Sequence, residues 1–254
     1  MAQRISIALA TYNGARFLRE QLDSFAVQTV LPDELVASDD GSADETVGIL
    51  REFAKDAPFE VRILQGERLG PAQNFGRAMA ETTGEVVFLS DQDDAWEPHK
   101  IGRVLEVDAP LVVHDLMLCD AALHPSGQTM SERMRLFGMA PDQNIKGCCS
   151  AIRRELLDLA LPIPDDIAHD VFIHALGRAT GWRMFVPEVL LRYRIHETNT
   201  SDFALNSLAP VTPWLRVRMS ASARWSGLGG RTPPRPPMEA LALKRLAERG
   251  VTPA

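Results

Sequence analysis

The chain has 254 residues, of which 45% are hydrophobic and 24% charged, and its formal net charge is −7. These values are ordinary for one soluble α/β domain with a full core, and the acidic balance argues against nucleic acid as the main partner. No apolar segment approaches the roughly 20 residues that a membrane-spanning helix needs, and residues 1–4 lead into a strand-like run without a signal-peptide core. Cys119, Cys148 and Cys149 form no disulfide framework or zinc motif, so we expect a reducing cytoplasm.

Strand-like and helix-like segments alternate four times in residues 1–108. Apolar, β-branched runs predict strands at 4–10, 35–37, 61–64 and 86–89. Apolar residues at helical spacing predict helices at about 17–26, 43–55 and 70–83, and a further helix beginning near Trp96. This alternation predicts a doubly wound, mostly parallel sheet flanked by helices, in which ligands bind beyond the carboxyl ends of the strands.

Three polar turns follow these strands, at Thr11–Gly14, Asp39–Ser42 and Ser90–Asp94. Each turn alone is consistent with ordinary loop chemistry, because Asn-Gly and Asp-Gly are common turn formers. Together, on one edge of one sheet, the three turns favour a nucleotide-binding site.

The sequence SDQDD places three carboxylates, Asp91, Asp93 and Asp94, within four residues. Like charges this close raise one another's pKa and destabilise a loop unless a cation neutralises them. Carboxylate oxygens suit a hard ion such as Mg²⁺ or Mn²⁺, which commonly shares its coordination with substrate phosphates. A solvated acidic turn that caps the following helix is the alternative.

Residues 109–202 have a less regular pattern. We expect 125–143 to be a loop-rich region. In a strand at 188–196, Arg192, Arg194 and His196 would share one face, where they could meet an anionic diphosphate. The other expected elements are strands at 111–118 and 147–152, the latter with its cysteines as packed hydrophobes, and a helix from His169 to Gly181.

Residues 203–254 form a basic, proline-containing extension that we expect to be helical in part. This segment holds eight Lys/Arg and two Asp/Glu, a net charge of +6, so residues 1–202 carry −13. The Trp-bearing stretch 203–230 could lie on an anionic membrane surface or pack on the protein as a helix. Residues 231–237 read as a stiff linker, and 238–249 as a short helix that either docks or stays free.

Three segments resemble successive motifs of the family 2 glycosyltransferases, which have the GT-A fold: ISIALATYNG, VASDDGSADET and FLSDQDDAWEPHKI. The similarity extends over roughly residues 4–200. SDQDD followed by Trp96, Pro98 and Lys100 most resembles the rhamnosyltransferase-like branch, which builds bacterial surface polysaccharides. The resemblance implies a catalytic domain at 1–202, with a nucleotide-binding half at 1–108 and an acceptor-binding half at 109–202.

The resemblance also implies roles for the polar turns. Tyr12 offers a stacking face to the donor base, and Asp39 accepts a hydrogen bond from a pyrimidine imide. The resemblance also places donor-contacting polar groups among Arg68, Asn74 and Arg77. Asn74 is included as a contact, which of the three reaches the nucleotide stays open, and Arg77 fits a solvated helix face better. The implied nucleotide-sugar contacts are Thr11, Tyr12, Asn13, Asp39, Asn74, Asp91, Arg194 and His196. The implied metal ligands are Asp91, Asp93 and His196, with Asp94, Asp40 and His169 in support.

An inverting sugar transfer needs a base that takes the proton of the acceptor hydroxyl. The resemblance assigns this role to Asp170, at the start of a predicted helix. A helix-terminal acid favoured by the helix dipole is the alternative, and Asp165 and Asp166 fit that alternative better. The branch usually has an aromatic residue after this Asp, whereas Val171 stands here.

These expectations describe a cytoplasmic, metal-dependent glycosyltransferase that uses Mg²⁺ or Mn²⁺. The resemblance favours dTDP-L-rhamnose as the donor, with a UDP-sugar as the alternative, and a glycan or lipid-linked glycan as the acceptor. Contact with the inner face of the membrane and oligomer formation stay open. A non-catalytic nucleotide-sugar-binding subunit of an assembly complex is the second hypothesis. A nucleotidyltransferase is less consistent, because Thr11–Gly14 is not a basic, glycine-rich phosphate loop.

Overall fold

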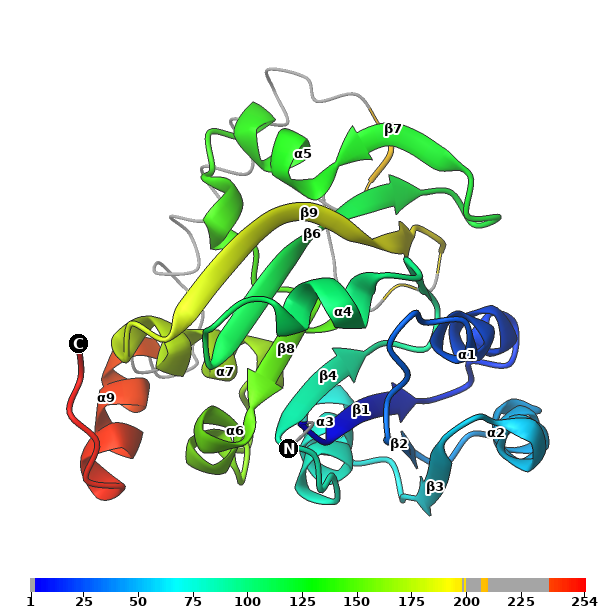
Figure 1. Cartoon of the computed structure of the whole chain (residues 1–254), viewed down its shortest axis with the longest axis horizontal. Helices are drawn as coiled ribbons and strands as arrows, with labels where there is room; N and C mark the ends of the chain where they lie inside the picture. Colours follow the sequence, from blue (N-terminus) through cyan, green and yellow to red (C-terminus); the bar gives the residue numbers. More distant parts are fainter. Residues whose placement is uncertain (1–2, 198, 200–206, 210–237) are drawn as a thin grey trace, which may run out of the picture.

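The structure is a computed structural model that describes residues 3–197, 199, 207–209 and 238–254. Its nine strands form one sheet in the order β3-β2-β1-β4-β8-β6-β9-β5, with β7 pairing on β6 (Figure 1). The nucleotide-binding half expected from the sequence contains β1 (Ile5–Thr11), α1 (Leu18–Ala26), β2 (Glu34–Asp39), α2 (Thr46–Asp56), β3 (Glu60–Gln65), α3 (Pro71–Ala80) and β4 (Val86–Ser90).

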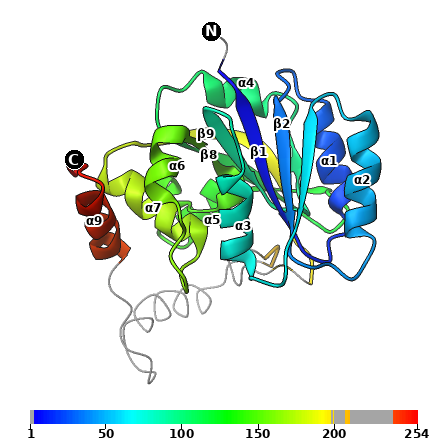
Figure 2. The same cartoon turned by 90° about the horizontal axis from the view of Figure 1, so that it is seen from below.

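The four strands of this first half are parallel, as predicted. The chain moves outward from β1 to β2 and β3, and then returns past β1 to form β4. Because parallel crossovers are right-handed, this reversal places α3 on the face opposite to α1 and α2 (Figure 2). The strand order therefore reverses between β1 and β4, and ligands usually bind beyond the carboxyl ends of the strands at such a switch point.

The second half of the sheet is mixed, so parallel pairing is not general. β8 runs antiparallel to β4 and β6, whereas β6 and β9 are parallel. The remaining elements before the C-terminal segment are β5 (Ala95–Trp96) and α4 (Lys100–Leu105), which still belong to 1–108, and then β6 (Leu111–Cys119), β7 (Pro125–Thr129), α5 (Met130–Leu136), the 3₁₀ turns η1 (Pro141–Gln143) and η2 (Gly147–Cys149), β8 (Ser150–Arg153), α6 (Arg154–Ala160), α7 (His169–Ala179) and β9 (Arg183–Arg194).

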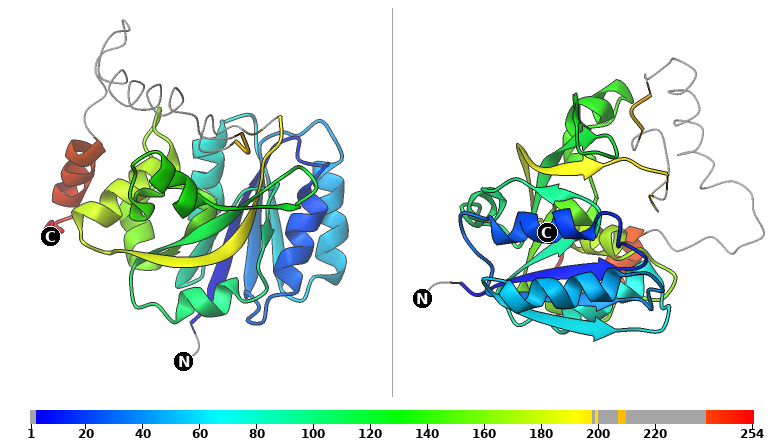
Figure 3. Two further views of the ribbon diagram at one scale, coloured as in Figure 1. Left: turned by 90° about the horizontal axis from the view of Figure 1, so that it is seen from above. Right: turned by 90° about the vertical axis from the view of Figure 1, so that its right-hand side faces the viewer.

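The long strand β9 carries the chain from the second half of the sheet back to the first half of the molecule. It starts near α7 and ends near α1 (Figures 1 and 3). Near its end β9 pairs antiparallel with β5, and Ala95 lies opposite Arg192. This pairing holds the loop between β4 and β5, which contains the three carboxylates, against the end of β9.

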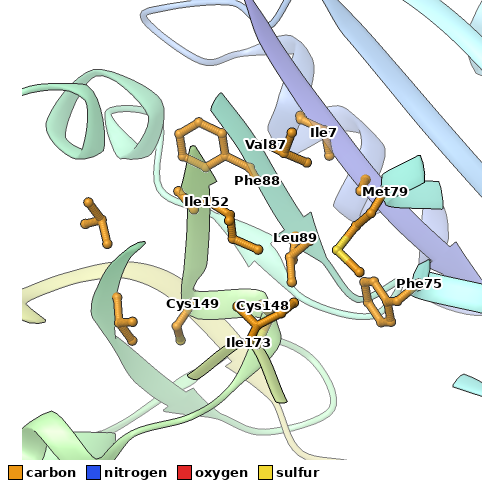
Figure 4. Packing of buried hydrophobic residues seen from close by; sticks show 14 of the residues in the cluster. Ile7, Phe75, Met79, Val87, Phe88, Leu89, Cys148, Cys149, Ile152 and Ile173 are labelled. Atoms are coloured by element: carbon orange, nitrogen blue, oxygen red, sulfur yellow. The ribbon is translucent and has the colours of Figure 1, made fainter. Parts of the chain in front are cut away.

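One continuous apolar core fills the space between the sheet and the helices. Around β4 and β8, Leu89 and Ile152 pack with Cys148, Cys149 and Ile173 (Figure 4). All three cysteines are free and buried, and for Cys148 and Cys149 this agrees with their expected role as packed hydrophobes. The core therefore extends directly beneath the loop Asp91–Asp94, called the acidic loop below.

Several predicted elements differ from the structure. Residues 125–143, expected to be loop-rich, form β7, α5 and η1, and a capping box between Thr129 and Glu132 starts α5. The helix expected from Trp96 begins only at Lys100, because Ala95–Trp96 pairs as a strand with β9.

Two further boundaries also shift. The strand expected at 188–196 begins already at Arg183, and the register slips between Val186 and Val189, around Pro187, which has no N–H to donate. At 147–152 only the last three residues belong to a strand.

The C-terminal segment is described only in part. Met238–Glu248 forms α9, which docks on α6 and α7 and buries Ala242 and Leu246. The predictions for 203–206 and 210–237 fall outside the described residues. None of the helices in the described part of the chain is both long and apolar enough to cross a membrane.

Candidate active site

The polar turns predicted from the sequence lie together at the switch in strand order. Thr11 ends β1 and lies opposite Asp39, the last residue of β2, and Ser90 ends the neighbouring β4. The hydroxyl of Thr11 donates to Asp39 Oδ1 over 3.1 Å, and both side chains are buried. These strand ends form the floor of the candidate site.

Asp39 organises the turn that follows it. Its Oδ2 accepts hydrogen bonds from the N–H groups of Gly41 and Ser42, and its Oδ1 also accepts one from the Ser42 hydroxyl. Gly41 has a φ of +80°, a conformation that side chains rarely adopt. The carboxylate of Asp39 is only 1% exposed, so its first effect is to set the shape of this loop.

Asp40 ties the same turn to the next helix. Its two carboxylate oxygens accept hydrogen bonds from the N–H groups of Leu69 and Gly70, at 2.7 and 2.8 Å. Gly70 immediately precedes α3, so the Asp40 side chain fixes the entry to that helix. This geometry agrees with a supporting position for Asp40.

Tyr12 is the exposed member of the first turn, with 41% of its surface accessible. The Arg68 guanidinium lies 5.6 Å from the centre of its ring. The Gln92 carboxamide binds the Tyr12 backbone on both sides, accepting from its N–H at 2.8 Å and donating to its carbonyl at 3.0 Å. Gln92 also fills the space beside Gly14, where an added Cβ would lie 2.1 Å from Gln92 Oε1. Gln92 therefore joins the acidic loop to the turn Thr11–Gly14, called the tyrosine turn below.

The side chains of Asn13 and Asn74 form hydrogen bonds to backbone groups of the neighbouring turns. Asn13 has a φ of +47°, its N–H donates to Ser42 Oγ, and its Oδ1 accepts from the N–H of Ala43. Asn74 is 3% exposed, and its amide donates to the Thr11 carbonyl at 3.2 Å. Among Arg68, Asn74 and Arg77, the three residues before β4 considered as contacts of the sugar donor, Arg68 is the one that lies over the Tyr12 ring.

The acidic loop carries strongly interacting carboxylates. Burial and then the charge of Asp93 raise the pKa of Asp91 to about 7, and Asp170 adds to this effect. Burial and the charges of Asp93 and Asp91 also raise the pKa of Asp94 well above its usual value. Asp94 is fully buried, and its Oδ1 accepts a hydrogen bond from the Arg194 N–H at 3.0 Å. Its Oδ2 is buried without a hydrogen-bond partner.

Two groups of possible metal ligands include carboxylates of this loop. Asp93 Oδ2 lies 2.9 Å from His196 Nε2, so two of the three predicted metal ligands touch each other. Within the described residues, side-chain atoms of Asp91, Asp94 and Cys148 also lie within 4.8 Å of one another. The oxygen-rich donor set and the unpartnered Asp94 oxygen fit a divalent cation.

Two lysines, Lys100 and Lys146, lie beside the carboxylates. Lys100 is fully buried, donates to the Cys148 carbonyl at 2.9 Å and lies 3.7 Å from the centre of the Trp96 ring. Burial lowers the pKa of Lys100 to about 8. Lys146 acts on Asp91 with the opposite charge. With Asp91, Asp93, Asp94 and Asp170 ionised, the two ammonium groups leave a net charge of −2, which one divalent ion would balance.

Arg194 is buried and has several partners. Its guanidinium donates to the carbonyls of Asp93 and Ala121, at 2.7 and 2.6 Å, and to the Glu20 carboxylate. It also lies 4.4 Å from the centre of the Phe17 ring. A direct contact with a diphosphate would require Arg194 to leave these partners. Arg192, two residues earlier, is half-exposed and binds Glu97.

Asp170 stands in the first turn of α7, near the acidic loop. Its charge contributes to the raised pKa of Asp91, and its Cβ would lie 3.7 Å from a Cβ added at Gly147. Neither Asp165 nor Asp166 caps this helix, which follows Ala168. Asp170 is thus on the same side of the sheet as Asp91.

His169 packs beside Asp170. It stacks on Phe75 with ring centres 4.0 Å apart, and burial lowers its pKa. Its Nε2 is buried and has no hydrogen-bond partner. The imidazole therefore connects α7 with α3 and supports the position of its neighbour.

Sequence reasoning assigned no role to Gln92, Lys100, Lys146 or Cys148. Lys100 offered a usable signal, because it falls on the inward face of a helix and lysine is almost never fully buried without a partner. A buried lysine at that position indicates a nearby carboxylate or carbonyl. Gln92 and Cys148 gave no such signal, since their partners are distant in the sequence.

Comparisons with known proteins identify the family of the chain. The model of glycosyl transferase family 2 matches residues 6–109. An uncharacterized glycosyltransferase of Nostoc sp. is 30% identical over 212 residues, covering 77% of this chain and 66% of the relative. A dTDP-rhamnosyl transferase of Shigella flexneri, RfbG, is 26% identical over 212 residues, covering 75% and 72%.

Solved structures show the same fold. A mannosyltransferase of Pyrobaculum calidifontis in complex with GDP-Man and Mn²⁺ aligns with a TM-score of 0.62, at 20% identity, over 98% of this chain and 76% of that one. TarS of S. aureus in complex with UDP-GlcNAc aligns with a TM-score of 0.61, at 19% identity, over 96% and 71%. The fold is that of the GT-A glycosyltransferases, and the chain belongs to glycosyltransferase family 2.

Proposed function

We propose that this protein is a metal-dependent, inverting glycosyltransferase that moves a sugar from a nucleotide-sugar donor onto a glycan acceptor. The main support is the proximity of Asp170 to Asp91, since the charge of one raises the pKa of the other. A base candidate and a carboxylate suited to the ion of a donor thus lie in one site. Neither role alone would define a transferase.

For the donor we propose a nucleoside diphosphate sugar whose base stacks on the exposed ring of Tyr12. Thr11, Asn13, Asp39 and Asn74 shape the surrounding turns. The Shigella relative is named for dTDP-rhamnosyl transfer, whereas TarS and the archaeal enzyme bind UDP-GlcNAc and GDP-Man. We favour dTDP-L-rhamnose, with a UDP-sugar as the alternative.

We assign the divalent ion, Mg²⁺ or Mn²⁺, to Asp91, Asp93 and His196. Such an ion, when bound, neutralises the negative charge that develops on the departing diphosphate. Asp94 supports the loop from below through the Arg194 N–H. His196 is held in turn by Asn199, whose Oδ1 accepts from the His196 N–H at 2.7 Å.

Asp170 performs the proton transfer in this proposal. Its carboxylate takes the proton of the acceptor hydroxyl while that oxygen forms a bond to the anomeric carbon of the sugar. The bond between the anomeric carbon and the diphosphate oxygen breaks, and the nucleoside diphosphate leaves on the opposite side. The sugar therefore changes its anomeric configuration.

For the acceptor we propose a surface polysaccharide or another glycan, free or linked to a lipid. The place of action would be the cytoplasm, including the inner face of the membrane. Oligomer formation is compatible with this proposal but is not needed by it.

The Asp170→Asn variant tests the proposed function. We expect sugar transfer to fall by about 10²–10⁴-fold, the usual contribution of a general base, with nucleotide affinity unchanged. The matched control is Asp166→Asn, which keeps a residue type that tolerates the φ of +62° found there and should transfer sugar normally.

Full activity of Asp170→Asn would refute the assignment of the base. If the wild-type protein bound a nucleotide sugar tightly but transferred it to none of the tested acceptors, the non-catalytic subunit would become the better description. Binding and turnover are therefore measured on the same preparations.

A further inference from the structure

The acidic loop contains a second convergence of ligand atoms, distinct from the contact between Asp93 and His196. Asp91, Asp94 and Cys148 each offer one atom, and the three atoms lie within 4.8 Å of one another. The Cys148 side chain also acts to lower the pKa of Asp91, against the larger effect of burial, which agrees with its position beside that carboxylate. Cys148 lies in η2, which the buried Lys100 ammonium holds through the Cys148 carbonyl.

One carboxylate oxygen of Asp94, a residue of this group, lacks a partner in the protein. Asp94 is fully buried, its Oδ1 accepts from Arg194, and its Oδ2 has no hydrogen bond. A buried carboxylate oxygen without a partner is costly, because nothing replaces its lost hydration. A bound cation would supply the missing interaction. Asp91 is partly exposed, so the group is not sealed from solvent.

The chemistry of the three ligands differs from that of an all-oxygen site. Zn²⁺ binds cysteine sulfur at about 2.3 Å and carboxylate oxygen at about 2.0–2.2 Å, with mutual ligand distances compatible with this group. Thiolates favour soft or borderline ions over Mg²⁺. Two carboxylates and one thiolate leave a fourth position open, as in zinc sites that also bind a water or substrate.

We propose that Asp91, Asp94 and Cys148 form a second metal site, specific for thiophilic divalent ions such as Zn²⁺ or Cd²⁺. On binding, the Cys148 S–H bond breaks, the proton leaves to solvent, and the sulfur electron pair forms the bond to the metal. The ion keeps its oxidation state. No redox partner is involved.

This site shares Asp91 with the hard-ion position at Asp93 and His196. A thiophilic ion that draws Asp91 toward Cys148 would remove one ligand from that position. In so far as this inference rests on the proposed function, it predicts that Zn²⁺ antagonises the binding of a nucleotide with Mn²⁺. The binding of Zn²⁺ itself does not depend on any transferase activity.

The test is a titration of the full-length, metal-free protein with Co²⁺ and Cd²⁺. We expect a thiolate-to-cobalt charge-transfer absorption in the wild-type protein and its loss in Cys148→Ser. Calorimetry should show that Cys148→Ser weakens Cd²⁺ binding by at least about 100-fold, the upper end of what even a supporting residue contributes. Mn²⁺ binding should change by less than about threefold, since oxygen ligands suit this ion.

Two variants serve as controls. Cys119→Ser removes a buried cysteine at the end of β6, and Cys149→Ser removes the direct neighbour, which is not a member of the group. Both should keep the cobalt absorption. Circular dichroism and the unfolding midpoint verify that Cys148→Ser is folded. A Co²⁺ complex of the wild-type protein without thiolate absorption, or equal Cd²⁺ affinity in Cys148→Ser, would overturn the proposal.

A second measurement separates this inference from the proposed function. Zn²⁺ should weaken Mn²⁺-dependent nucleotide binding in the wild-type protein and much less in Cys148→Ser. A protein that binds Co²⁺ through sulfur but transfers no sugar would refute the transferase and leave the metal site intact. Sugar transfer by a protein that binds no Co²⁺ through sulfur would refute the metal site and leave the transferase intact.

Discussion

At the residue scale, the acidic loop combines buried carboxylates with two lysines and a thiol. Asp94 and Lys100 are both fully buried, and the charge of Asp94 acts to raise the pKa of Lys100 against the larger effect of burial. The charges in this loop therefore form one coupled group. Removing or adding one charge should change the stability of the whole loop.

The raised pKa of Asp91 predicts that stability of the metal-free protein depends on pH. The pKa is about 7 in the folded chain and about 3.9 in an unfolded one, so the folded state binds more protons between these values. Stability should therefore decrease as pH rises from about 4 to about 7, by about 1–2 kcal/mol after a discount for partial exposure. Asp94 acts in the same direction.

Thermal unfolding in the presence of a chelator, at pH 5.5 and 8, measures this effect. Mn²⁺ should remove most of the difference, because it replaces the proton as the neutralising partner. A metal-free protein that is more stable at pH 8 than at pH 5.5 would contradict the assigned coupling.

A second prediction concerns Arg194, whose guanidinium has protein partners on three sides. Arg194→Lys should lower the free energy of unfolding by about 2–4 kcal/mol, because an ammonium group cannot satisfy the same buried acceptors. Arg192→Lys is the control on the same strand. Its single exposed ion pair with Glu97 predicts a loss below about 0.5 kcal/mol.

Urea unfolding of both variants gives the comparison. If Arg194→Lys kept full stability but lost nucleotide affinity, Arg194 would be a ligand of the diphosphate, as its place in the sequence motif predicts, and its contacts in the free protein would be secondary.

The sequence could predict the turns that carry the site, but only part of their contacts. Asp39, Asp91 and Asp170 are found in one region because parallel strands end at one edge and α7 begins nearby. The hydrogen bond from the Asn74 side-chain amide to the Thr11 carbonyl could not be predicted. Such a contact depends on the path of α3 above β1, which periodicity does not specify.

At the scale of elements, the regular first half was predictable and the second half only partly. Buried parallel strands are short apolar runs, and helices between them show a 3.6-residue period. α5 lies in a region without a clean period, although its capping box was present in the sequence as Thr129 and Glu132. β5 has two residues and exists through its pairing with β9, so no local signal could identify it.

The docking of α9 answers the question that its sequence left open. Arg245 donates to the carbonyl groups of Leu159 and Ala160, both at 3.1 Å, at the end of α6. Such carbonyls have no partner within their own helix. The Arg245 guanidinium also lies 5.2 Å from the centre of the Phe172 ring.

For α9 we predict different costs for two leucines. Leu246→Ala should lower the free energy of unfolding by about 2–4 kcal/mol, because this side chain is fully buried. Leu243→Ala, on the same helix but 39% exposed, should cost less than about 1 kcal/mol. Chemical denaturation of both variants tests this, and equal small effects would indicate that α9 is not docked in solution.

At the scale of the whole molecule, two halves of different construction share one sheet. The first half is parallel and carries the tyrosine turn and the acidic loop, while the mixed second half provides α7 and the end of β9. Because β9 returns to pair with β5, the site contains groups from both halves. Binding of a donor should therefore stabilise the whole fold.

A thermal-shift panel of nucleotide sugars, with and without Mn²⁺, tests this expectation. At a ligand concentration of 100 times Kd, the gain is about 2.7 kcal/mol for a ligand that binds only the folded state. We expect dTDP-rhamnose with Mn²⁺ to give the largest shift, above UDP- and GDP-sugars. A larger shift with a UDP-sugar would change the assigned donor, and no shift with any nucleotide would argue against the proposed function.

The hydrogen bond from the Arg194 N–H to Asp94 Oδ1 has a practical consequence. The chemical shift of an amide proton responds to the charge of the carboxylate that accepts it. The cross-peak of this single amide in a nitrogen-15 NMR spectrum would thus act as a built-in reporter of events in the acidic loop. Ion arrival, proton loss and donor binding could each be followed there, without knowledge of the acceptor.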